Sequence, residues 1–136
     1  MPTCIEFPLG YKQTPFGSLP DPKVPVAVRT RRGWRTYRFL LDTGADFSLA
    51  PRRLAEEVGL PWETLREARV VGIELGGIAA RLGHLPLRVG SVELSVRCLF
   101  IDAASAPFLL GRADFLERFV VTIDTEQDKI ILREIL

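Results

Sequence analysis

Proline and glycine interrupt this chain at short intervals, with 10 prolines and 11 glycines among 136 residues. The segments between them are mostly short and rich in Val, Ile, Leu and Phe. Short apolar runs bounded by turn-forming residues are typical of β-strands. We therefore predict an all-β, closed fold, with strands at 4–9, 24–30, 34–41, 92–101, 108–111, 120–123 and 129–135.

Three segments differ from this pattern. Residues 51–58 are predicted to form a helix, because Pro51 suits the first helical turn and Gly59 can end the helix. A second short helix is expected at 113–118. Residues 10–22 contain three prolines and two glycines, which favours a loop or arm over regular structure.

Composition excludes several classes of protein. The formal net charge is +1, so no overall field would attract nucleic acid or an anionic membrane. No apolar run approaches the roughly 18–20 residues that cross a bilayer, and the N-terminus lacks the pattern of a signal peptide. The length of 136 residues is usual for one domain. We expect a single cytoplasmic domain over residues 1–136, with residues 1–22 as an N-terminal strand and arm.

The chain has only one histidine, His84, and two cysteines, Cys4 and Cys98. A Cys/His zinc site, a Ser-His-Asp triad or a Cys-His dyad would each need that one histidine. His84 is interpreted as an ordinary strand residue, and the cysteines as two reduced thiols in a reducing compartment. Any catalysis is therefore expected to use carboxylates, hydroxyls or backbone groups, with no metal and no cofactor.

One segment concentrates groups capable of chemistry, the run Leu-Leu-Asp-Thr-Gly-Ala-Asp-Phe-Ser at residues 40–48. Asp42 directly follows an apolar strand, where a charge is costly unless it is paired or functional. Thr43 supplies a hydroxyl that can hold neighbouring backbone, and Gly44 allows a sharp turn. Asp42 is thus our candidate catalytic residue; the alternative is a carboxylate that caps a turn after a strand.

The tetrapeptide Asp42-Thr43-Gly44-Ala45 resembles the active-site signature of aspartic proteases, in particular the retroviral-type (retropepsin-like) branch. It would occur by chance in about 1 of 500 chains of this length. Residues 108–116, Phe-Leu-Leu-Gly-Arg-Ala-Asp-Phe-Leu, resemble the family's second signature. The resemblance covers roughly residues 24–132. It implies a closed retropepsin-like β-barrel, equivalent to half of a pepsin-like fold, with one or two short helices and a flap hairpin.

The resemblance also implies an activity, the hydrolysis of peptide bonds by two carboxylates that share one proton. The ionised carboxylate takes a proton from a bound water, and the protonated one hydrogen-bonds the developing oxyanion. No aspartate other than Asp42 is followed by Thr-Gly or Ser-Gly. The second carboxylate must then come from Asp42 of another copy, so activity implies a homodimer with twofold symmetry.

Supporting residues around the catalytic aspartate follow from the same resemblance. Thr43 would bond the opposite loop across the twofold axis, and Gly44 would leave room for it. Asp46 and Arg112 match positions that form an ion pair beneath the active site in relatives; the alternative is an ordinary surface pair. The backbone from Gly44 through Ala45 to Asp46 would hydrogen-bond an extended peptide as an added strand.

A long hairpin is expected between the two signatures, with arms at 69–75 and 78–89 that bend around Gly76 and Gly77. In the family, this position belongs to the flap. Residues expected to line apolar pockets for the substrate are Ile73, Leu75, Leu109 and Leu110.

Two other functions remain open from the sequence. The chain could be a retropepsin-like dimer that binds peptide or protein segments without cutting them. A weaker alternative is nucleic-acid binding by the hairpin at 29–38, which carries five arginines around Trp34 and Tyr37. Alternation predicts that those arginines face solvent and that both rings point inward, which favours a solvated hairpin with no nucleic-acid partner.

Overall fold

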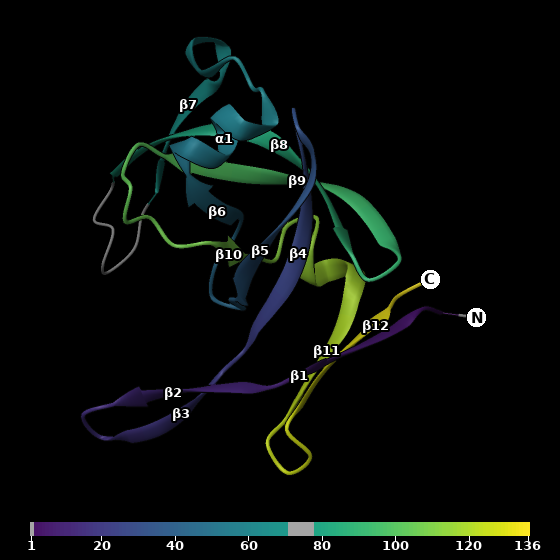
Figure 1. Ribbon diagram of the computed structural model, residues 1–136. Helices are drawn as coiled ribbons and strands as arrows, with labels where there is room; N and C mark the ends of the chain where they lie inside the picture. The colour runs from purple at the N-terminus through teal and green to yellow at the C-terminus, as the bar shows by residue number, and fades with distance from the viewer. Residues whose placement is uncertain (1, 71–77) are drawn as a thin grey trace.

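The computed structural model describes residues 2–70 and 78–136. Six strands form a closed β-barrel in which each strand is hydrogen-bonded to two neighbours (Figure 1). In order around the barrel they are β4 (Lys23–Thr30), β5 (Gly33–Leu41), β10 (Leu109–Leu110), β6 (Ser48–Pro51), β9 (Val92–Ile101) and β8 (Ile78–Val89). Pairing of β4 with β8 at Ala27 and Val28 closes the barrel. The predicted closed, mostly β fold is confirmed.

Alternation along the strands explains why the barrel has a continuous core. In β4, Val24, Val26 and Val28 are completely buried, while the residues between them are not. Because successive side chains of a strand point to opposite faces, one face of β4 fills the barrel. Phe39, Phe100 and Phe115 are the largest fully buried side chains of this core.

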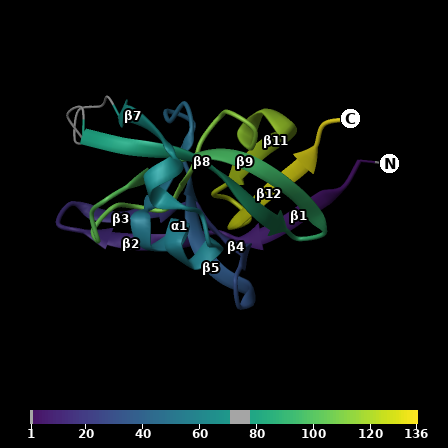
Figure 2. The same cartoon turned by 90° about the horizontal axis from the view of Figure 1, so that it is seen from above.

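A second sheet packs beside the barrel and contains both ends of the chain. Its order is β1 (Cys4–Pro8), β12 (Lys129–Glu134) and β11 (Phe119–Asp124), all antiparallel. Figure 2 shows β1 and β12 side by side, with the two termini at the same end of the molecule. The strands predicted at 120–123 and 129–135 are confirmed as β11 and β12.

The segment predicted as a loop or arm, 10–22, is an arm with regular structure. The segment is a hairpin of β2 (Gly10–Thr14) and β3 (Gly17–Asp21), which extends away from the barrel as an arm (Figure 1). Proline is tolerated here because both strands of a two-stranded hairpin are edge strands. Pro15 lies in the turn, and only Pro20 occupies a paired position, opposite Tyr11.

The predicted helix at 51–58 is confirmed as α1 (Arg52–Val58). Gly59 ends it with a φ of 91°, and its N–H donates to the carbonyls of Ala55 and Glu56. This left-handed conformation explains why glycine follows the helix. A short 3-10 helix, η1 (Trp62–Thr64), comes next.

The second predicted helix, at 113–118, is shorter than expected. Only η2 (Leu116–Arg118), a 3-10 turn, is helical. The backbone of Asp114 has a φ of 67°, which a right-handed helix does not allow. No helix within residues 2–70 and 78–136 is long and apolar enough to cross a membrane.

The predicted long hairpin is present as β7 (Arg66–Val70) and β8, which pair antiparallel. The described part of its first arm starts earlier than the expected 69–75. Its predicted bend at Gly76 and Gly77, together with Ile73 and Leu75, lies outside the described residues.

The one histidine and the two cysteines lie as expected of ordinary structural residues. His84 lies exposed in β8 as an ordinary strand residue. Cys4 is exposed and Cys98 is buried, and both are free thiols.

The inward orientation predicted for Trp34 is wrong. The residue is 37% exposed, and its ring packs on Arg88, whose guanidinium carbon lies 4.4 Å from the ring centroid. Residues 33–36 are all exposed, so the core does not reach this end of the hairpin. Tyr37, farther along, is half-buried and donates a hydrogen bond to Glu57. Glu56 and Glu57 lie against the arginines of this hairpin, which favours the interpretation as a solvated surface.

Candidate active site

Asp42 is the first residue after β5, in a turn that its own carboxylate stabilises. The backbone N–H of Asp42 donates to the carbonyl of Leu110 at 3.0 Å. Its Oδ1 accepts the N–H of Gly44 at 2.9 Å, and its carbonyl accepts the N–H of Ala45 at 3.2 Å. The bond from Gly44 N–H to the Asp42 carboxylate is the one expected if this carboxylate caps the turn. It uses one carboxylate oxygen, and the side chain remains half-buried rather than enclosed.

The loop after β10 crosses the Asp42 loop and is joined to it by backbone hydrogen bonds. Arg112 N donates to Ala45 O, and Ala113 N to Asp46 O, both at 2.9 Å. Gly111 N donates to the hydroxyl of Ser48, a completely buried side chain, at 3.2 Å. Two segments 63 or more residues apart are thus held together as one rigid unit beneath Asp42.

Gly111 is where the two loops approach most closely. A Cβ at this position would lie 2.3 Å from the carbonyl oxygen of Phe47 and 2.9 Å from that of Ala45. Such distances are essentially never seen, so only glycine fits. Gly111 and Ser48 were missed as site residues, although the same pattern, an apolar strand that ends in glycine, occurs at 39–44 and again at 108–111.

The structure brings Asp46 and Arg112 together as an ion pair. The same guanidinium donates from Nη1 to the carbonyl of Thr43 at 2.9 Å. The side chains are 75% and 54% exposed, respectively, so the charge attraction by itself is worth about 0–1 kcal/mol. The additional bond to Thr43 O means that Arg112 holds both ends of the loop 43–46.

A cavity of about 500 Å³ opens between the Asp42 loop and the β7–β8 hairpin. Residues of the loop and of the neighbouring strands that line it are Gly44, Ala45, Asp46, Phe47, Leu49, Leu82 and Leu99. Strand β7 lines the opposite side with residues 66–69. The cavity has an apolar base and a charged rim, as a groove for an extended peptide would have.

The two leucines predicted to line substrate pockets differ in their surroundings. Leu109 is half-buried and packs on a small cluster with Leu49 and Ile101. Leu110 is completely buried in the barrel core. The prediction for Leu110 is therefore wrong, because β10 alternates and points this side chain inward.

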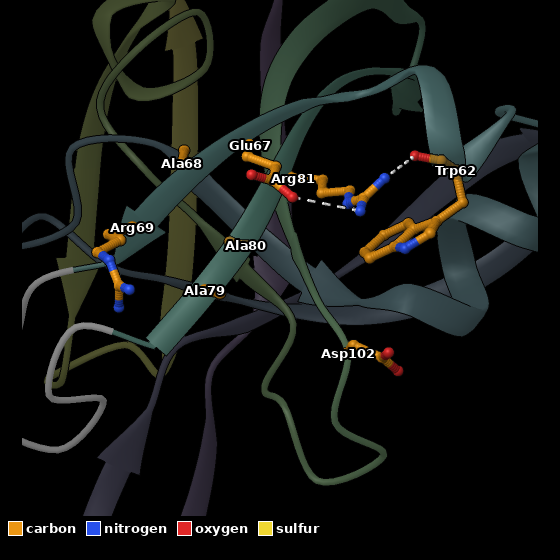
Figure 3. Close-up of a pocket in the computed structure, with 8 residues that line it drawn as sticks. All are labelled: Trp62, Glu67, Ala68, Arg69, Ala79, Ala80, Arg81 and Asp102. Carbon is orange, nitrogen blue, oxygen red and sulfur yellow. Dashed lines mark hydrogen bonds and ion pairs between the residues drawn. The ribbon is translucent and has the colours of Figure 1, made fainter.

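The outer face of the β7–β8 hairpin has its own pocket, of about 390 Å³ (Figure 3). Arg81 extends from β8 across this face toward Trp62, donates to its carbonyl at 2.7 Å and lies 3.5 Å from Glu67. The guanidinium carbons of Arg81 and Arg52 lie 5.2 and 4.5 Å from the Trp62 ring centroid. These contacts fasten the base of the hairpin to η1.

One strongly paired carboxylate near the site was not foreseen. Asp114 accepts hydrogen bonds from the backbone N–H of Arg97 at 2.9 Å and from its guanidinium at 2.8 and 3.1 Å. These bonds to Arg97 hold the pKa of Asp114 below its usual range. The guanidinium carbon also lies 5.3 Å from the ring centroid of Phe47. No sequence signal connects positions 97 and 114, because the pairing depends on the crossing loops.

Comparison with known proteins agrees with this geometry. A family profile described as aspartyl protease matches residues 24–113, a span that contains both crossing loops. The chain belongs to the aspartyl protease family. Among curated proteins, none matches its sequence.

Solved structures give the fold. A retropepsin-like aspartic protease from Rickettsia conorii is similar with a TM-score of 0.65 and 20% identity, over 98% of this chain and 94% of that one. The retroviral protease-like domain of Ddi1 from Leishmania major is similar with a TM-score of 0.58 and 20% identity, over 85% and 94%. The fold of this aspartyl protease family member is retropepsin-like.

Proposed function

We propose that this protein is a homodimeric aspartic endopeptidase in which Asp42 of each subunit is catalytic. The observation that carries this proposal is the position of the Asp42 carboxylate, half-buried on a turn that a second loop holds rigidly, next to a peptide-sized groove. A carboxylate in that setting can be aimed at a bound peptide without reorganisation.

In the proposed mechanism, the two Asp42 carboxylates face each other across the twofold axis and share one proton. The ionised carboxylate accepts a proton from a water, and that water attacks the scissile carbonyl carbon. The protonated carboxyl group donates a hydrogen bond to the oxyanion as it forms. Collapse of the tetrahedral intermediate breaks the C–N bond, and the leaving nitrogen takes up a proton from the pair. We expect Arg112, Asp46, Thr43 and Gly44 to hold the loop during these steps.

The requirement for a second subunit follows from the presence of one Asp-Thr-Gly per chain. Two features support a twofold contact next to the site. Thr43 is exposed at the edge of a hollow of about 320 Å³ whose apolar lining is Leu116, Phe119 and Val121. Val120 and Ile123 are exposed on β11, an edge strand. Burial of this apolar surface would favour association.

The substitution Asp42→Asn tests the catalytic role, with Glu126→Gln, at an exposed position in a turn, as the matched control. We expect Asp42→Asn to abolish cleavage of reduced, carboxymethylated casein, while sedimentation velocity still shows a dimer. The control should cleave normally. Full activity of Asp42→Asn would refute the proposal.

Mixing the two forms tests whether both subunits contribute. After free exchange of equal amounts of wild-type and Asp42→Asn protein, about one quarter of the dimers should contain two wild-type subunits. Activity per wild-type chain should therefore fall to about half. An unchanged activity per wild-type chain would show that one Asp42 is sufficient.

Peptide binding without cleavage is the second candidate function. It is favoured by the hydrogen bond from Gly44 N to Asp42 Oδ1, since a carboxylate that only caps a turn would make the same contact. In that case the wild-type protein would bind unfolded casein but leave it intact at every pH.

A further inference from the structure

Among the described residues, the groove beside the Asp42 loop has a charged side chain that forms no ion pair. Four charged residues line it, namely Asp46, Arg66, Glu67 and Arg69. Asp46 is paired with Arg112. Glu67 contributes to the lining from β7, but its side chain points to the outer face of the hairpin, 3.5 Å from its direct cross-strand partner Arg81 (Figure 3). Both carboxylates of the groove are therefore already neutralised by arginines.

Arg66 differs from them. Within residues 2–70 and 78–136, its guanidinium makes no ion pair and no side-chain hydrogen bond, and the residue is exposed. Its cross-strand partner is Leu82, which lines the groove. Because side chains alternate along a strand, Arg66 and Ala68 share the face opposite to Glu67. Ala68 is paired with the buried Ala80, so this face is the inner one.

We infer that Arg66 selects substrates that carry an acidic side chain near the cleaved bond, an inference that rests on the proposed function. A guanidinium can bind a carboxylate with two parallel hydrogen bonds, and it does so more strongly when peptide covers the pair. A cationic substrate side chain would find Asp46 and Glu67 already paired and Arg66 repulsive.

The position of the acidic residue follows from the path of the chain. The groove is lined by residues 44–47, which begin two residues after Asp42. Because the groove adjoins the Asp42 loop and an extended peptide advances about 3.3 Å per residue, we place the acidic side chain within about four residues of the cleaved bond. A twofold dimer would have one such groove on each side of that bond.

The test is a cleavage profile of a mixture of proteome-derived peptides, read by mass spectrometry. Wild type, Arg66→Gln and Arg66→Glu are compared. Arg29→Glu, at an exposed position of β4, is the control for the change in net charge. We expect Asp and Glu to be enriched within four residues of the sites cleaved by wild type and by Arg29→Glu. The enrichment should disappear in Arg66→Gln and change to Lys and Arg in Arg66→Glu.

A pair of peptides that differ only in Glu or Gln at the enriched position gives the magnitude. For wild type we expect kcat/KM to be roughly fivefold higher for the Glu peptide, near the upper end for a partly exposed ion pair. For Arg66→Gln the ratio should approach one. Cleavage without acidic enrichment, or enrichment that survives Arg66→Glu, overturns the inference alone. If no variant cleaves any peptide, the proposed function fails and the inference fails with it.

Discussion

Replacing Gly111 by alanine should destabilise the protein far more than one methyl group would suggest. The added Cβ would lie 2.3 Å from the oxygen and 2.4 Å from the carbon of the Phe47 carbonyl, and 2.9 Å from Ala45 O. All three atoms belong to the backbone, so no side-chain rotation can relieve the overlap. The two loops must separate by about 1 Å to regain normal contact distances.

Two effects of this movement lower the free energy of unfolding. Overpacking of a well-packed site costs about 1–3 kcal/mol. The movement also weakens the hydrogen bonds from Arg112 N to Ala45 O and from Ala113 N to Asp46 O, each worth about 1 kcal/mol. We expect the free energy of unfolding of Gly111→Ala to fall by about 3–5 kcal/mol, which is a large part of the total for a domain of this size.

Urea denaturation followed by tryptophan fluorescence measures this loss, at one fixed protein concentration because association affects apparent stability. Gly10→Ala is the matched control, since a Cβ there meets only Asp21 O, at an ordinary 3.9 Å. Its free energy of unfolding should stay within about 0.5 kcal/mol of wild type. If Gly111→Ala were as stable as Gly10→Ala, the view that the crossing loops are rigidly interlocked would be refuted.

Three further outcomes are expected. Asp114→Asn should lower the free energy of unfolding at pH 7 by roughly 1–2 kcal/mol. Because Arg97 lowers the pKa of Asp114 in the folded state, this difference from wild type, measured by urea denaturation, should shrink below pH 4; a constant difference would contradict the expectation. With Ellman's reagent, Cys4 should react within minutes and Cys98 only after unfolding, since burial raises the pKa of the Cys98 thiol; two fast thiols would be the contrary result. Burial and the neighbouring Glu57 carboxylate raise the pKa of Tyr37 to about 12, so absorbance at 295 nm should show this phenol ionising well above pH 10. The folded state should lose stability as pH rises between about 10 and 12; ionisation of Tyr37 near pH 10 in the folded protein would contradict its described burial and pairing.

Local patterns in the sequence predicted much of this fold. The alternation of Val24, Val26 and Val28 identified β4 and its buried face, because period 2 is intrinsic to an extended chain. Gly59 marked the end of α1, since few other residues accept its positive φ. The Asp42-Thr43-Gly44-Ala45 run identified the family. Each of these signals lies within a few neighbouring residues, so no knowledge of distant contacts was needed.

Three features depended on contacts between distant residues. The short strand β6 exists through its pairing with β9 and β10, and its four residues have no pattern of their own. Leu110 is buried although it adjoins the site, because closure of the barrel decides which face of β10 points inward. The hairpin at 10–22 formed despite its prolines, since edge strands do not need every N–H.

The same distinction applies to the candidate site. The residue types suited to catalysis could be read from the chain, since a carboxylate, a hydroxyl and a glycine in sequence carry their chemistry with them. What only the tertiary structure decided was which groups surround them: Gly111 against Phe47, Arg97 with Asp114, and Arg66 across the groove from the Asp42 loop. These neighbours are brought together by barrel closure and loop crossing, and such long-range contacts leave no periodic trace in the sequence.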